Sequence, residues 1–89
     1  MKLTPLASNM TELEIVPAND VTKDSTWILF SYSTPVAGSS PDRGNFKTAK
    51  WYSQTTTRHI KKYFRKEWGI DSDTVQEIDQ ERINNMLEK

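Results

Sequence analysis

A short apolar block near the centre of the chain places the strongest limit on its fold. Residues 26–34 (TWILFSYST) are rich in β-branched and aromatic residues, which favour a β-strand. Side chains alternate along a strand, so Trp27 and Leu29 point to one face while Ile28 and Phe30 point to the other. Both faces are apolar and both need cover. We therefore expect a central strand inside a sheet that is covered on two sides.

Two further segments predict strands beside this one. Residues 11–16 alternate between polar and apolar residues, which indicates a half-buried strand that ends at Pro17. Residues 46–52 (FKTAKWY) predict a third strand. It is expected to return antiparallel to the central strand after a loop of turn-forming residues, Gly38 to Asn45.

Two helices are expected after the strands. Ser53 is a suitable N-cap for the first, and Gly69 can close it in a left-handed conformation. Its apolar side carries Ile60, Tyr63, Phe64 and Trp68. Asp73 to Gln76 has the form of a capping box and predicts a second helix that runs to about Glu88. The predicted fold class is α+β, a three-stranded antiparallel meander followed by two helices (β-β-β-α-α), with the first helix on one face and the second helix, or a partner subunit, on the other.

Length and residue types limit the chemistry. At 89 residues the chain predicts a single α+β domain over residues 11–89, after a flexible N-terminal arm over residues 1–10 that shows no periodicity. The absence of cysteine excludes a disulfide framework, a thiolate metal site and a thiol nucleophile. The single histidine, His59, has no recognisable nucleophile or orienting partner, and the sequence has no phosphate-binding or calcium-binding loop. The prediction is a non-enzymatic protein with no catalytic residue, metal, cofactor or small-molecule substrate.

The apolar segments also limit where the protein acts. The longest apolar run, Trp27 to Phe30, is far shorter than the ~20 residues of a membrane-spanning helix. The first residues lack the apolar core of a signal peptide. We therefore expect a cytoplasmic protein without membrane association.

Charge is unevenly distributed although the formal net charge is zero. From Arg43 to Lys66 there are eight basic residues and no acidic residue, whereas the segment from Glu67 to Lys89 is mainly acidic. Helical spacing places five of the cations opposite the apolar side of the first helix. The candidate nucleic-acid contacts are Lys47, Lys50, Arg58, Lys61, Lys62, Arg65 and Lys66. This strip predicts binding to phosphates of DNA or RNA with little sequence preference, and stacking by Trp51, Tyr52 or Tyr63 where these are exposed.

Two other interpretations are open at this stage. The acidic second helix can neutralise the cations within the molecule. Alternatively, Trp27, Leu29 and Trp51 form an apolar patch on the second face of the sheet, if the second helix leaves that face bare. Such a patch predicts a homodimer or a protein-interaction module with a structural or host-targeting role.

Part of the sequence resembles small uncharacterised bacteriophage proteins. The shared pattern consists of LFSYSTPVA at residues 29–37, Phe46-Lys47-Thr48, and then Ser53, Thr55-Thr56 and Arg58-His59-Ile60. The resemblance covers about residues 26–68. It implies a phage or phage-derived accessory protein in the cytoplasm of a host cell, and it assigns no catalytic residue, cofactor or partner.

Overall fold

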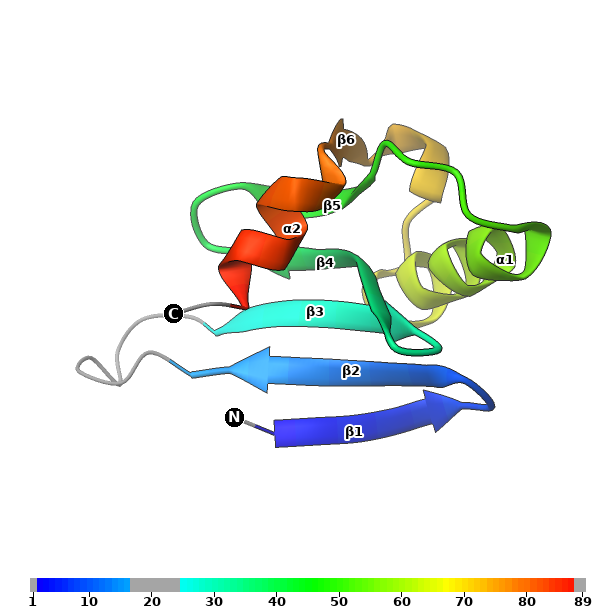
Figure 1. Ribbon diagram of the computed structural model, residues 1–89, viewed down its shortest axis with the longest axis horizontal. Helices are drawn as coiled ribbons and strands as arrows, with labels where there is room; N and C mark the ends of the chain where they lie inside the picture. Colours follow the sequence, from blue (N-terminus) through cyan, green and yellow to red (C-terminus); the bar gives the residue numbers. More distant parts are fainter. Residues whose placement is uncertain (1, 17–24, 88–89) are drawn as a thin grey trace.

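The computed structural model describes residues 2–16 and 25–87 (Figure 1). The strands are β1 (Lys2–Ala7), β2 (Met10–Ile15), β3 (Thr26–Ser31), β4 (Thr34–Ser40), β5 (Gly44–Thr48) and β6 (Gln76–Ile78). The helices are α1 (Gln54–Tyr63), the π-helical segment η1 (Phe64–Trp68), the 3-10 turn η2 (Ser72–Thr74) and α2 (Gln80–Met86). The six strands form one sheet in the order of the chain, antiparallel except for the parallel pair of β5 and β6.

The predicted three-stranded β-β-β-α-α fold is therefore wrong, because three strands were missed. The first is β1, which replaces the predicted arm over residues 1–10 and pairs with β2. A register shift between Pro5 and Ala7 interrupts the two-residue period that reveals a strand in a sequence. Pro5 is tolerated because β1 lies at the edge of the sheet. Asn9 makes the tight turn to β2 with a φ of 62°.

The second missed strand is β4, which contains the start of the predicted loop. The strand predicted for residues 26–34 ends at Ser31, and the chain turns at Tyr32, where φ is 58°. Tyrosine favours strands and rarely adopts this left-handed conformation, so the sequence does not reveal the turn. The backbone N–H of Tyr32 donates a hydrogen bond to the carbonyl oxygen of Asn9 (2.8 Å), which holds the turn in place.

The third missed strand, β6, lies within the predicted second helix. Asp71 rather than Asp73 caps the structure at this point, and its carboxylate accepts a hydrogen bond from the backbone N–H of Asp73 (3.0 Å). Val75 and Ile78 are three residues apart, a spacing that is also helical, but they belong to different hydrophobic clusters. The backbone of β5 offers an open edge, and β6 pairs with it in parallel, so that α2 begins only at Gln80.

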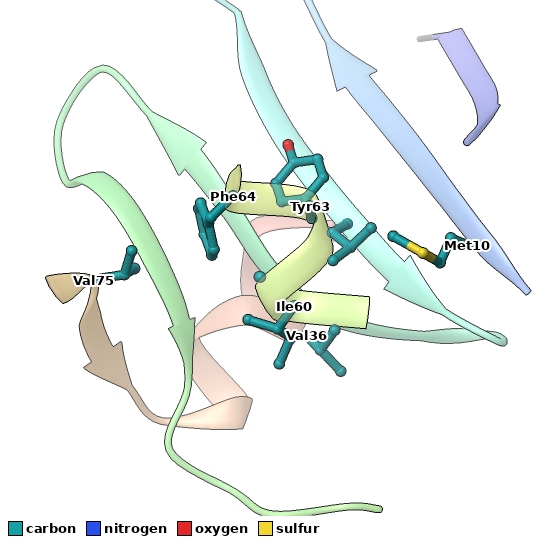
Figure 2. Packing of buried hydrophobic residues seen from close by; sticks show 8 residues of the cluster. Met10, Val36, Ile60, Tyr63, Phe64 and Val75 are labelled. Carbon is teal, nitrogen blue, oxygen red and sulfur yellow. The ribbon is translucent and has the colours of Figure 1, made fainter. Parts of the chain in front are cut away.

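The two helices cover opposite faces of the sheet, which is one of the two arrangements expected from the sequence. Leu29 packs with residues of α1, whereas its neighbour Ile28 packs with Ile83 of α2. Both side chains on β3 are completely buried. Figure 2 shows the α1 side, where Ile60, Tyr63 and Phe64 lie against residues of the sheet: Met10, Val36 and other members of the same cluster. The prediction of a central strand covered on both faces is confirmed.

The boundaries of the first helix are also confirmed. Ser53 caps α1, and its hydroxyl accepts a hydrogen bond from the backbone N–H of Thr56 (3.1 Å). Gly69 ends η1 with a φ of 65°. Between them the helix widens into the π-helical segment, which the sequence did not indicate. Each residue turns through a smaller angle there than in an α-helix, and Trp68, expected on the apolar side, remains 37% exposed.

Candidate nucleic-acid interface

Five cations project from the solvent side of α1 and η1. This basic face consists of Arg58, Lys61, Lys62, Arg65 and Lys66, and all five residues are exposed. The opposite side of the same helix is buried through Thr56, Ile60, Tyr63 and Phe64. The hydrophobic anchoring fixes the helix on the sheet, so the basic face has a defined position in the molecule. The predicted separation of apolar and basic sides is confirmed except at Trp68, which is 37% exposed.

The second helix does not neutralise the basic face. α2 packs through Ile83 on the other side of the sheet, so the sheet separates it from the cations of α1 (Figure 1). Glu67 lies exposed on η1 itself, and two further carboxylates near α1 and η1 have other partners. Glu12 accepts a hydrogen bond from the Tyr63 hydroxyl (2.6 Å), and Asp71 caps η2. α2 itself therefore does not balance these charges, whereas Asp73 and Glu77, which belong to the segment predicted as the second helix, line a hollow together with Lys61.

The two strand lysines differ from the helix cations. Lys47 on β5 is half-buried, and its Nζ donates a hydrogen bond to the carbonyl oxygen of Ser72 (2.9 Å). This hydrogen bond connects the sheet to η2. Lys50 is exposed, and its Nζ lies 5.1 Å from the centre of the Tyr52 ring, within the range of a cation–π interaction. Lys50 is thus available to a ligand, whereas Lys47 already has a structural partner.

A hollow of about 210 Å³ lies beside the basic face. It is bordered by the end of β5 and the loop that follows, by α1 from Thr56 to Lys61, and by η2 and β6. The residues of this loop hollow that matter for binding are Lys47, Lys50, Lys61, Trp51, Tyr52, Asp73 and Glu77. Lys61 also belongs to the basic face, so the two surfaces are continuous.

Asp73 and Glu77, which belong to the segment predicted as the second helix, also line the loop hollow. They reach the loop hollow because β6 returns to pair beside β5, after a connection that includes all of α1. No local signal in the sequence reports such a long-range pairing.

The three aromatic residues considered for stacking have different exposures. Trp51 is 70% exposed, Tyr52 is half-buried and Tyr63 is buried in the core. Burial raises the pKa of Tyr63, and the hydrogen bond to Glu12 acts in the same direction. Burial also raises the pKa of Glu12. Tyr63 is therefore a neutral structural donor, and Trp51 is the aromatic residue that a ligand can reach.

His59 participates in a hydrogen-bonded link between α1 and β3. Its Nδ1 lies 2.7 Å from the Ser31 hydroxyl, which lies 3.0 Å from the Thr56 hydroxyl. Burial lowers the pKa of His59, and the charge of Lys62 lowers it further. A serine beside a histidine also occurs in hydrolases, but Ser31 is only 2% exposed and out of reach of a substrate. The pair connects two elements of the fold.

The apolar patch predicted for a protein interface does not form. Leu29 lies completely buried under α1, and Trp27 is half-buried. Trp51 is exposed but lies in the loop after β5 rather than on a strand. The patch was predicted on the assumption that one face of the sheet lacks cover, and the helices cover both faces.

Within the described ranges, 2–16 and 25–87, no three histidine, aspartate or glutamate side chains gather closely enough to hold a metal ion. In the same part of the chain, no helix is both long enough and apolar enough to cross a membrane.

The fold and the basic face define a small α+β domain with a cationic helix held on a six-stranded sheet. The chain belongs to a family of unknown function (DUF8033), whose family model matches residues 1–85. Comparisons with curated proteins and with solved structures found no significant match. The family description names no activity or source, so the phage origin, the location in a host cytoplasm and the non-enzymatic role stay predictions.

Proposed function

We propose that the protein binds nucleic acid through the basic face, by contacts with phosphates and without strong sequence preference. The observation that carries the proposal is the exposure of all five cations on one side of α1 and η1. Phosphate recognition of this kind needs closely spaced positive charges that remain accessible. The packing of α2 through Ile83 on the other side of the sheet leaves the basic face open to such a ligand.

The number of cations gives the expected salt dependence. Each phosphate contact releases condensed counterions, and the logarithm of the binding constant falls by about 0.7 to 0.9 per contact for each tenfold rise in salt. If all five cations contact phosphates, a plot of the logarithm of the binding constant against the logarithm of the salt concentration is expected to have a slope of roughly −3.5 to −4.5. Binding is expected to weaken steeply over the physiological range of salt.

A double variant that removes two cations from the basic face tests the assignment. We expect Lys62→Gln with Arg65→Gln to reduce the steepness of the salt dependence by roughly 1.4 to 1.8, because two phosphate contacts are lost. The measurement is fluorescence anisotropy of a labelled oligonucleotide, titrated with the protein at several salt concentrations. Lys61 is left unchanged because it also lines the loop hollow.

The matched control removes two cations from the α2 side. Arg43 and Arg82 are exposed and line a different pocket, together with Met86 of α2. Arg43→Gln with Arg82→Gln makes the same change in net charge and is expected to leave the slope unchanged. An equal loss in both double variants would show that net charge alone matters, and absence of binding at low salt would refute the proposal.

A further inference from the structure

We infer that the loop hollow binds an unpaired base, which makes single-stranded nucleic acid the preferred ligand. This inference rests on the proposed function, because the basic face must hold the phosphates beside the hollow. Three observations carry it: the exposure of Trp51, the mixed charge of the hollow, and the position of Lys61 between the hollow and the basic face.

Trp51 presents a large apolar surface to water. It is 70% exposed and lies three residues before the start of α1, next to the first turn of the helix that carries the basic face. An exposed indole offers a free aromatic face, and bases stack on such a face whatever their identity. The neighbouring pair of Lys50 and Tyr52 adds a positive charge beside it. The surroundings of Trp51 thus suit stacking without sequence preference.

The charges in the loop hollow favour a base over a phosphate. Asp73 and Glu77 contribute carboxylates, which repel phosphate but accept hydrogen bonds from the amino groups of bases. Lys50 and Lys61 contribute donors, which suit the carbonyl oxygens and ring nitrogens of bases. Donors and acceptors together match the edge of an uncharged base.

The continuity of the two surfaces explains how one strand engages both. Lys61 lines the hollow and is also part of the basic face. A strand whose phosphates follow the basic face therefore brings a base within reach of Trp51. In a duplex the bases are paired and stacked on each other, and none offers a free face to the indole. The hollow is expected to add affinity for single strands only.

The experiment compares Trp51→Ala and Trp51→Phe with the wild-type protein. The probes are an oligothymidine, an oligouridine and a DNA duplex of matched length. We expect Trp51→Ala to weaken binding of the single strands by about 5- to 100-fold, the loss of one stacked base, with duplex binding unchanged. Trp51→Phe retains an aromatic face and is expected to keep most of the affinity. The two single-stranded probes show whether the site distinguishes DNA from RNA.

Two controls separate stacking from a general effect on the fold. Leu3→Ala changes an apolar residue of similar exposure (65%) on the edge strand β1, and it is expected to leave all binding unchanged. Single strands should also quench an emission component that is present in the wild-type protein and absent in Trp51→Phe. This signal reports contact with the indole even if Trp51→Ala folds poorly.

The outcomes distinguish this inference from the proposed function. Salt-dependent binding of single strands and duplex with equal affinity would overturn the inference and leave the basic face supported. The inference would also be overturned if Trp51→Ala lost affinity equally for single strands and for the duplex. Absence of fluorescence quenching at Trp51 would overturn it as well. If no probe binds at low salt, the proposed function itself fails.

Discussion

At the scale of single residues, His59 lies where the buried and basic sides of α1 meet. The Ser31 hydroxyl is its partner on β3, the Tyr32 ring lies 5.8 Å away, and Lys62 contributes a nearby positive charge. Burial, and then Lys62, lower the pKa of His59 below 6.5 in the folded protein. The neutral imidazole is therefore the form that the fold favours.

This preference predicts a pH dependence of stability. Below pH 6.5 the unfolded chain takes up a proton on His59 while the folded protein remains neutral. The unfolded state then binds more protons, so the free energy of unfolding decreases as the pH falls from 6.5 towards the lowered pKa of the folded protein. We expect urea denaturation to show this decrease, and His59→Asn to make it smaller while keeping a side chain that can bond to Ser31.

The titration of Glu12 changes stability with pH in the opposite direction, so its contribution has to be separated from that of His59. Its pKa is raised above 4.5, so the folded protein keeps a proton that the unfolded chain releases, and stability falls as the pH rises through that window. Glu12→Gln removes this contribution. An unchanged pH dependence in His59→Asn, measured in the Glu12→Gln background, would show that His59 is not held in its neutral form.

At the scale of elements, β3 and β4 come unusually close at Gly38. A Cβ atom at this position would lie 2.0 Å from the carbonyl oxygen of Trp27 and 2.9 Å from the ring of Phe46. The first contact is with backbone that is fixed in the sheet. The sequence marks Gly38 only as a turn former, whereas the structure requires it for strand pairing.

Gly38→Ala is therefore expected to destabilise the protein by about 3 kcal/mol or more, because the two strands must separate locally. Gly44→Ala is the matched control. Gly44 has a φ of 72° but open space around it, so alanine there costs about 1 to 2 kcal/mol through its backbone conformation alone. Urea denaturation of both variants gives the comparison. If Gly38→Ala lost no more stability than Gly44→Ala, the close approach of Gly38 to the backbone of Trp27 would be contradicted.

The elements differ in how far local sequence predicts them. β2, β3 and α1 have signals within their own residues, such as the alternation of residues 11–16 and the cap at Ser53. β6 depends on pairing with β5, which is distant in the sequence, whereas β1 and β4 pair with neighbouring strands but contain a proline, Pro5 or Pro35, that normally ends a strand. The basic face was predictable because it belongs to one helix. The loop hollow was not, because residues 72–77, which are distant in the sequence from residues 47–61, complete it.

At the scale of the whole molecule, the sheet separates two hydrophobic clusters. Met10, Leu29 and Phe64 belong to the cluster under α1, and Ile28 and Phe46 belong to the cluster under α2. Neighbouring residues of β3 thus contribute to both. Stability is expected to depend on both helices, because neither cluster is complete without its helix.

Substitutions in the two clusters test this arrangement. Ile28→Ala and Leu29→Ala are each expected to cost about 2 to 5 kcal/mol, the usual loss for a completely buried aliphatic side chain. The two variants and the wild-type protein should each unfold in one cooperative transition, followed by circular dichroism. Val16→Ala, at an exposed position, is expected to change stability by less than about 0.5 kcal/mol. If one variant lost the full ~2 to 5 kcal/mol of stability and the other lost almost none, only one face of the sheet would be tightly packed.

The parallel pairing of β5 with β6 also has a consequence for synthesis of the chain. The antiparallel strands β1 to β5 leave the ribosome first, but β6 and α2 emerge only after the long connection through α1. Until Ile83 emerges, the face of the nascent sheet that carries Ile28 and Phe46 lacks its cover. The growing polypeptide is therefore most prone to aggregation after β5 and before α2 has emerged, and chaperones that bind exposed apolar segments would act on it at that stage.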